Sequence, residues 1–230
     1  MKKIFFTVVM VALLAFAGSG LATTITIDRV TGYYSGSGGE FNIAGLGTAT
    51  NSLYAASALV NNKYGVQGFE TFCLEMDEYV SIPGTYNAVI NPNNQAYGGG
   101  VNTDTGDTIS VGTAYLYYLF SQGTLTGYNY TAGSDRIASA AALQNTIWAL
   151  EDEGVSDPGH FTFLLTTTFG DWANAKANYT SNIYGVGVLN LTTLSDGPAQ
   201  DQLVRTPEPS TILLLGLGLI GLAGIKRKVK

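Results

Sequence analysis

Two residues with the capacity for unusual chemistry stand far apart in the chain. Cys73 is the single cysteine, so it cannot form an internal disulfide. An unpaired cysteine of this kind is a buried small hydrophobe, an intermolecular linker or a reactive group. Gln144 lies three residues after Ala141 and four before Trp148, so helical periodicity turns its amide toward the apolar face that Ile137, Ala141 and Trp148 form.

Burying the Gln144 amide without partners would cost about 1–3 kcal/mol. The sequence leaves two ways to avoid that cost. Either the amide is hydrogen-bonded to a neighbouring strand, or its carboxamide has been consumed in a covalent bond for which Cys73 is the candidate partner.

The elements that position these residues follow from periodicity and turn signals. Alternating, β-branched and aromatic residues predict strands over 24–27, 69–80, 86–90 and 182–194. Clusters of Gly, Ser, Asn and Asp predict loops over 35–39, 91–100 and 102–107. The pattern indicates an α+β fold, a mainly β sandwich or barrel-like domain with inserted helices.

Helices are predicted in the second half of the chain. Ser110 caps a segment over 111–120 that ends at Gly123. The helix that carries Gln144 is predicted over 136–153, with Ser134 or Asp135 as its cap. A third is predicted over 171–179.

The N-terminus has the order of a secretory signal. Lys2 and Lys3 precede an apolar run over 4–17, and small residues follow as far as Ala22. This order predicts a signal peptide over 1–22, so fold reasoning begins at Thr23.

The C-terminus carries a second apolar run. It predicts a short transmembrane helix over 211–225. A full span needs roughly 20 residues, so flanking residues and the long side chains of the lysines must extend it at its ends. The basic residues Lys226, Arg227 and Lys228 follow it. Positive charge at both ends of the chain predicts two cytoplasmic termini, with everything between them outside.

These C-terminal residues resemble a known sorting signal. Pro207, Glu208 and Pro209, then an apolar helix, then a basic cluster are similar to the PEP-CTERM sorting tail of Gram-negative bacteria, here over 207–230. The resemblance implies processing near the Pro-Glu-Pro motif by an exosortase, a membrane transpeptidase. It also implies an exported protein, tethered to the inner membrane through the C-terminal helix and then found at the cell surface or in the extracellular matrix of a biofilm or floc.

A second resemblance concerns Cys73 and Gln144. An aromatic-Cys-aliphatic strand around Phe72 and a later helical Gln-x-x-Ile-Trp, which includes Ile147 and Trp148, resemble the thioester domains of bacterial surface adhesins over about 68–154. The resemblance implies that the Cys73 sulfur and the Gln144 side-chain carbonyl join with loss of ammonia, with Phe72, Ile147 and Trp148 as motif support. Such a bond acylates an amine or hydroxyl on an extracellular polymer or surface, which is covalent adhesion.

Charge excludes some functions. The exported domain, 23–206, holds sixteen acidic and five basic residues, a net charge of −11, which argues against nucleic-acid binding. The acidic runs at 75–78 and 151–153 are interpreted as solvated surface, so neither a metal site nor a cofactor is predicted.

The sequence therefore predicts a protein that is not an enzyme. The alternative to covalent adhesion is a non-reactive structural or carbohydrate-contacting matrix protein. An enzyme that pairs Cys73 with His160, the single histidine, is a third option.

Overall fold

The computed structural model describes residues 22–206 apart from 37, 92, 99–105 and 156–158. The predicted sorting tail, with its transmembrane helix over 211–225, lies outside these residues, as does the predicted signal peptide apart from Ala22. Within the described part of the chain, no helix is long and apolar enough to cross a membrane.

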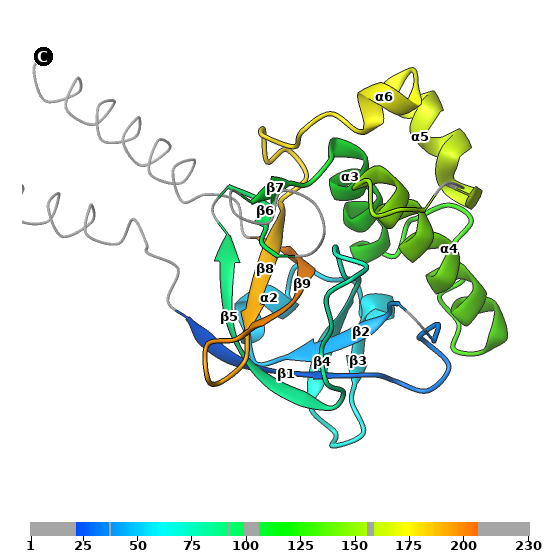
Figure 1. Ribbon diagram of the computed structural model, residues 1–230. Helices are drawn as coiled ribbons and strands as arrows, with labels where there is room; N and C mark the ends of the chain where they lie inside the picture. Colours follow the sequence, from blue (N-terminus) through cyan, green and yellow to red (C-terminus); the bar gives the residue numbers. More distant parts are fainter. Residues whose placement is uncertain (1–21, 37, 92, 99–105, 156–158, 207–230) are drawn as a thin grey trace, which may run out of the picture.

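A seven-stranded antiparallel sheet dominates the fold (Figure 1). Its strand order is β3-β4-β2-β1-β5-β8-β9. The strands are β1 (Thr23–Asp28), β2 (Phe41–Ala44), β3 (Leu59–Asn61), β4 (Gln67–Thr71), β5 (Gly84–Asn91), β8 (Val186–Thr192) and β9 (Pro198–Arg205). Two short strands, β6 (Gln95–Ala96) and β7 (Asp107–Thr108), form a separate pair. The mainly β prediction is confirmed.

Strand β1 shows why alternation predicted strands correctly here. Ile25 and Ile27 are buried in the core, whereas Thr24 and Thr26, which alternate with them, are exposed. Ile27 lies opposite Ile43 of β2, which fixes the register of the sheet.

The residues just after β4, the strand next to the edge strand β3, pair with β9 at the opposite edge of the sheet. Phe72 O accepts a hydrogen bond from Leu203 N of β9 at 3.1 Å, and Leu74 N donates to Asp201 O at 3.1 Å. Cys73 forms a bridge with Gln202 between these bonds. The sheet therefore curls toward a barrel, and Cys73 lies in the seam that closes it. The strand predicted over 69–80 is shorter than expected because the chain becomes irregular after this seam.

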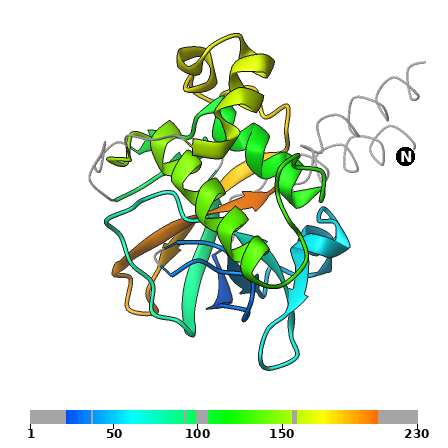
Figure 2. The same cartoon turned by 90° about the vertical axis from the view of Figure 1, so that its right-hand side faces the viewer.

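The helices gather on one side of the sheet, and in Figure 2 the green and yellow-green helices α3 and α4 lie in front of its strands. They are α3 (Val111–Ser121), α4 (Ser134–Leu150), α5 (Thr162–Phe169) and α6 (Trp172–Ala175). Short helical turns occur at α2 (Thr48–Asn51), η1 (Ala56–Ala58) and η2 (Gly159–Phe161). The predicted cap of α3 is confirmed, since the Ser110 hydroxyl accepts a hydrogen bond from Thr113 N. Helix α4 begins after Gly133 without a side-chain cap, so the predicted capping by Ser134 or Asp135 is wrong.

A buried acid also holds α3 in place. The carboxylate of Glu151, which follows α4, accepts hydrogen bonds from Ser110 N and the Thr113 hydroxyl. Glu151 and Glu153 are both buried, so the interpretation of 151–153 as solvated surface is wrong for these two residues. Their polar atoms have partners that the linear sequence could not indicate.

An ion pair deep in the protein ties α4 to the start of β2. Arg136 donates two hydrogen bonds to the carboxylate of Glu40, at 2.7 and 2.6 Å, and both side chains are almost fully buried. Arg136 also donates to the carbonyl oxygen of Ser57. The Tyr128 hydroxyl donates to the same Glu40 carboxylate at 2.6 Å, so the buried charges are densely hydrogen-bonded.

Replacement of Arg136 by alanine should lower the free energy of unfolding by about 3–5 kcal/mol, because Glu40 would remain buried without its cation. Urea denaturation monitored by circular dichroism measures this change. The matched control is Lys176→Ala, which removes a surface ion pair with Asp152 and should cost at most about 1 kcal/mol. Equal losses in the two variants would contradict the prediction.

Candidate functional site

The carboxamide of Gln144 pairs with the backbone of Cys73. Its Nε2 donates to Cys73 O at 2.8 Å, and its Oε1 accepts from Cys73 N at 3.3 Å. Oε1 also accepts from Gly39 N at 2.9 Å. The amide thus occupies the place that a neighbouring strand would take, and its polar atoms are satisfied by hydrogen bonds in this unreacted state.

The same arrangement brings the sulfur of Cys73 to the Gln144 carbonyl. The thiol donates to Oε1, with 3.4 Å between Sγ and Oε1. Two backbone N–H groups, from Gly39 and Cys73, converge on that oxygen. If the sulfur attacks the carbonyl carbon, negative charge develops on this oxygen, so the two donors form an oxyanion hole for the reaction.

The environment of Cys73 keeps its thiol protonated. The residue is fully buried, and this burial raises the pKa of the thiol far above its ordinary value. The backbone N–H of Cys73, then the charge of Arg29 and the Trp148 side chain, act in the opposite direction and lower the pKa. Nε1 of Trp148 is buried and has no conventional hydrogen-bond partner among the described residues. These three groups therefore favour the thiolate against the effect of burial.

Two glycines let the chain pass directly over the pair. A Cβ on Gly38 would lie 2.4 Å from Cγ of Gln144 and 3.1 Å from Cη2 of Trp148. A Cβ on Gly39 would lie 2.5 Å from Cδ1 of Phe72. A side chain at either position would displace the groups beneath it, so both positions depend on glycine. The sequence predicted only a loop here and did not identify the backbone N–H of Gly39 that this segment directs at Gln144 Oε1.

The residues predicted as motif support all lie in the protein interior. Phe72 and Ile147 are fully buried, and Trp148 is nearly so. Phe72 contacts Phe120 edge to face, with 5.0 Å between ring centroids. The predicted sorting residues Pro207, Glu208, Pro209, Lys226, Arg227 and Lys228 lie outside the described residues.

The buried face of α4 is offset by one residue from the predicted face. The sequence grouped Ile137 and Ala141 with Gln144 and Trp148, but Ile137 and Ala141 are only half-buried. The stripe that faces the core is made of Arg136, Ala140, Leu143 and Ile147. Gln144 and Trp148 lie one position round the helix from this stripe, where they meet the seam.

A second buried glutamine, Gln202, also lies beside Cys73. Gln202 of β9 forms a bridge with Cys73 in the seam, and it is fully buried. Its Nε2 donates to Gln200 O at 3.3 Å, whereas its Oε1 has no partner among the described residues. The sequence did not identify Gln202, because only the closure of the sheet brings it beside Cys73.

Three carboxyl groups lie next to the seam. Ligand atoms of Glu75, Asp77 and Glu153 lie within 4.8 Å of one another. Burial, and then the negative charge of Glu153, raise the pKa of Glu75 to about 9. At neutral pH Glu75 is therefore protonated and hydrogen-bonded to Glu153. Glu75 is 4% exposed, so its interpretation as solvated surface is wrong.

Comparison with known protein families identifies the C-terminal signal. The model described as "PEP-CTERM protein-sorting motif" matches residues 205–228. This match supports the prediction from the sequence: the chain carries the sorting signal of an exported protein that is processed by an exosortase. No curated protein and no solved structure matches the chain significantly. The resemblance to thioester domains stays a prediction, which rests on the two motifs and the geometry of the pair.

Replacement of Gly38 by alanine should push the Gln144 side chain away from Cys73 and destabilise the fold by about 1–3 kcal/mol, since the new methyl has no room. Urea denaturation measures the loss. Gly36→Ala is the matched control, because a Cβ at Gly36 meets nothing within 4 Å. A Gly38→Ala variant as stable as the Gly36→Ala variant would contradict the close approach.

The stability of the protein should fall as pH rises from about 5 to about 9. A carboxyl group whose folded pKa is raised binds its proton more tightly in the folded state, so its stabilising effect is complete below the unfolded pKa and is lost as pH rises through the folded pKa. For Glu75 this window runs from 4.5 to about 9. The Glu75→Gln variant should show a weaker decline of melting temperature with pH. Asp196→Asn, at an exposed turn, is the control, and an identical decline in wild type and Glu75→Gln would refute the assignment.

Proposed function

We propose that this exported protein is a cell-surface or extracellular-matrix adhesin in which Cys73 and Gln144 form an internal thioester. One observation carries the proposal. Oε1 of Gln144 lies 3.4 Å from the Cys73 sulfur and accepts hydrogen bonds from two backbone N–H groups, those of Gly39 and Cys73. A glutamine that served only to pair with a strand would not require the thiol beside its carbonyl.

Thioester formation follows from these positions. The Cys73 sulfur attacks Cδ of Gln144, and the negative charge that develops on Oε1 is stabilised by the N–H groups of Gly39 and Cys73. The bond from Cδ to Nε2 then breaks, and the thiol proton leaves with the nitrogen as ammonia. Cys73 O loses the hydrogen bond that it accepts from Nε2. The oxyanion donors keep their partner, because Oε1 becomes the carbonyl oxygen of the thioester.

Adhesion is the second half of the chemistry. An amine or hydroxyl of an extracellular polymer or surface attacks Cδ of Gln144, and Cys73 leaves as a thiolate. Arg29 and Trp148 stabilise this thiolate until it takes up the proton of the attacking group. The product is an amide or ester bond to Gln144 and a free thiol on Cys73.

Two features protect the bond until a target arrives. Cys73 and Gln144 are both buried, at 0% and 1% exposure, so bulk water does not reach the acyl carbon. The two lysines of the exported domain are engaged in ion pairs, Lys63 with Asp28 and Lys176 with Asp152. These pairs reduce acylation of the protein's own amines.

The intact mass of the purified protein should be lower by one ammonia than the mass its sequence gives after any processing at the chain ends. Mass spectrometry of wild type and variants measures this deficit, because that processing is common to all of them. Cys73→Ala and Gln144→Ala should each abolish the deficit.

Gln202→Ala is the matched control, since it removes the other buried glutamine beside Cys73. This variant should retain the deficit. If the deficit is lost in Gln202→Ala but kept in Gln144→Ala, the acyl donor is misassigned. A wild-type protein of full mass, whose thiol is alkylated after unfolding, would refute the thioester and favour the non-reactive structural role.

A further inference from the structure

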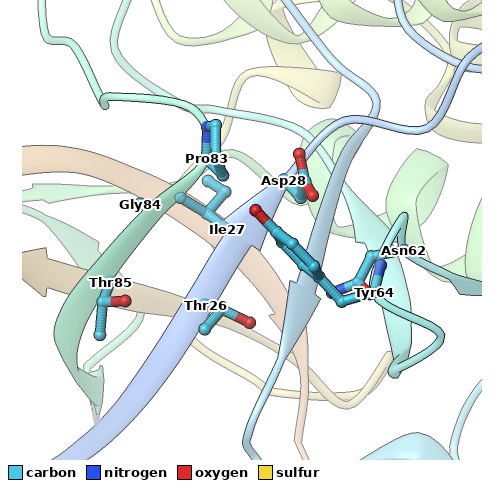
Figure 3. A pocket seen from close by; sticks show the side chains of 8 residues that line it. All are labelled: Thr26, Ile27, Asp28, Asn62, Tyr64, Pro83, Gly84 and Thr85. Atoms are coloured by element: carbon cyan, nitrogen blue, oxygen red, sulfur yellow. The ribbon is translucent and has the colours of Figure 1, made fainter.

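We propose that a hollow on the opposite side of β1 from the core binds a neutral sugar ring of an extracellular polysaccharide. The hollow lies between β1, the turn that joins β3 to β4, and the start of β5 (Figure 3). Its volume is about 230 Å³, which is below the roughly 300 Å³ of the smallest pockets for drug-sized ligands. A single ring with neighbours extending into solvent suits this size.

An aromatic ring forms one wall. Tyr64, in the turn after β3, is 67% exposed. Figure 3 shows its ring extended across the hollow with the hydroxyl toward Asp28. The backbone of Tyr64 is held, because its N–H donates to Oδ1 of Asn62 at 3.0 Å. An exposed aromatic face on a fixed backbone offers an apolar platform for the C–H face of a sugar.

A carboxylate with an unused oxygen lies at the base of the hollow. Asp28 is 4% exposed, and its Oδ1 accepts from Arg29 N at 2.9 Å. Its Oδ2 is buried and has no hydrogen-bond partner among the described residues. A buried carboxylate oxygen of this kind requires a donor, and a ligand hydroxyl supplies one.

The remaining groups favour a neutral ligand over a cation. The Lys63 ammonium lies 3.7 Å from Oδ1 of Asp28 and 5.1 Å from the centroid of the Tyr64 ring. The position that a ligand cation would take between this acid and this ring is therefore already filled. Thr26 and Thr85 add hydroxyl groups, which both donate and accept, as the hydroxyls of a sugar do.

This site is independent of the thioester. The hollow provides reversible contact with a polysaccharide, whereas acylation is irreversible, so each can fail without the other. Reversible binding would also hold a polymer near the protein while a nucleophile finds the acyl carbon.

Isothermal titration calorimetry of the full-length protein with neutral hexasaccharides of glucose, mannose, xylose and N-acetylglucosamine tests the proposal. At least one should bind, and Tyr64→Ala and Asp28→Asn should each weaken that binding about tenfold or more. Tyr79→Ala is the matched control, because Tyr79 is an exposed tyrosine that does not line the hollow. It should leave the affinity unchanged.

Further binding experiments distinguish reversible sugar binding from acylation and from anion binding. Binding should be equal in wild type and in Cys73→Ala, and its loss in Cys73→Ala would assign it to acylation and overturn the proposal. A galacturonate hexasaccharide tests for an anion site, and binding of this probe alone would also overturn it. Absence of binding to every neutral hexasaccharide, or full affinity in Tyr64→Ala, would do the same. Tyr64→Ala changes an exposed side chain, so its result does not depend on refolding of the buried Asp28 variant.

Discussion

The structure depends on the pairing of the Gln144 carboxamide with the backbone of Cys73. Closure of the sheet turns Phe72 and Leu74 toward β9, so the N–H and C=O of Cys73 between them need partners from another element. Helix α4 supplies both through one side chain. The same constraint that satisfies these buried polar groups brings a carbonyl carbon beside a thiol, so the packing of the fold and its proposed chemistry share one set of contacts.

Several acidic side chains are buried in this protein. The pKa values of Glu70, Glu75 and Asp201 are raised, to about 8, 9 and 7, chiefly because burial disfavours their charged forms. Burial also raises the pKa of Glu40, against which Arg136 acts, and the two hydrogen bonds from Arg136 fix the position of α4 against the start of β2. The acidic residues of the exported domain therefore do not all lie on its surface, and some of them contribute to the interior.

Periodicity and capping signals predicted the elements that follow simple local rules. Burial alternates along β1, and α3 begins at a serine cap. Periodicity missed β9, because Gln200, Asp201 and Gln202 are buried polar residues. Gln200 and Asp201 find hydrogen-bond partners in other parts of the chain, Glu75 and Leu191. Helix α5 was missed as well, since only Leu165 within it is fully buried and the apolar stripe is weak. The face of α4 was displaced by one position because its first buried residue is Arg136, a charged side chain that a hydrophobic pattern cannot place in the core.

The sequence by itself determined the sorting signal at the C-terminus and singled out Cys73 and Gln144 as the candidate pair. A sorting signal is read as a linear segment, and Cys73 and Gln144 are recognised by their own residue types and near neighbours. Only the tertiary structure decided that the two meet, which backbone groups face their carbonyl, and that Gly38 and Gly39 cover them. These properties depend on contacts among three segments: the residues before β2, the seam that follows β4, and helix α4. The three segments are distant in sequence and meet only when the sheet closes.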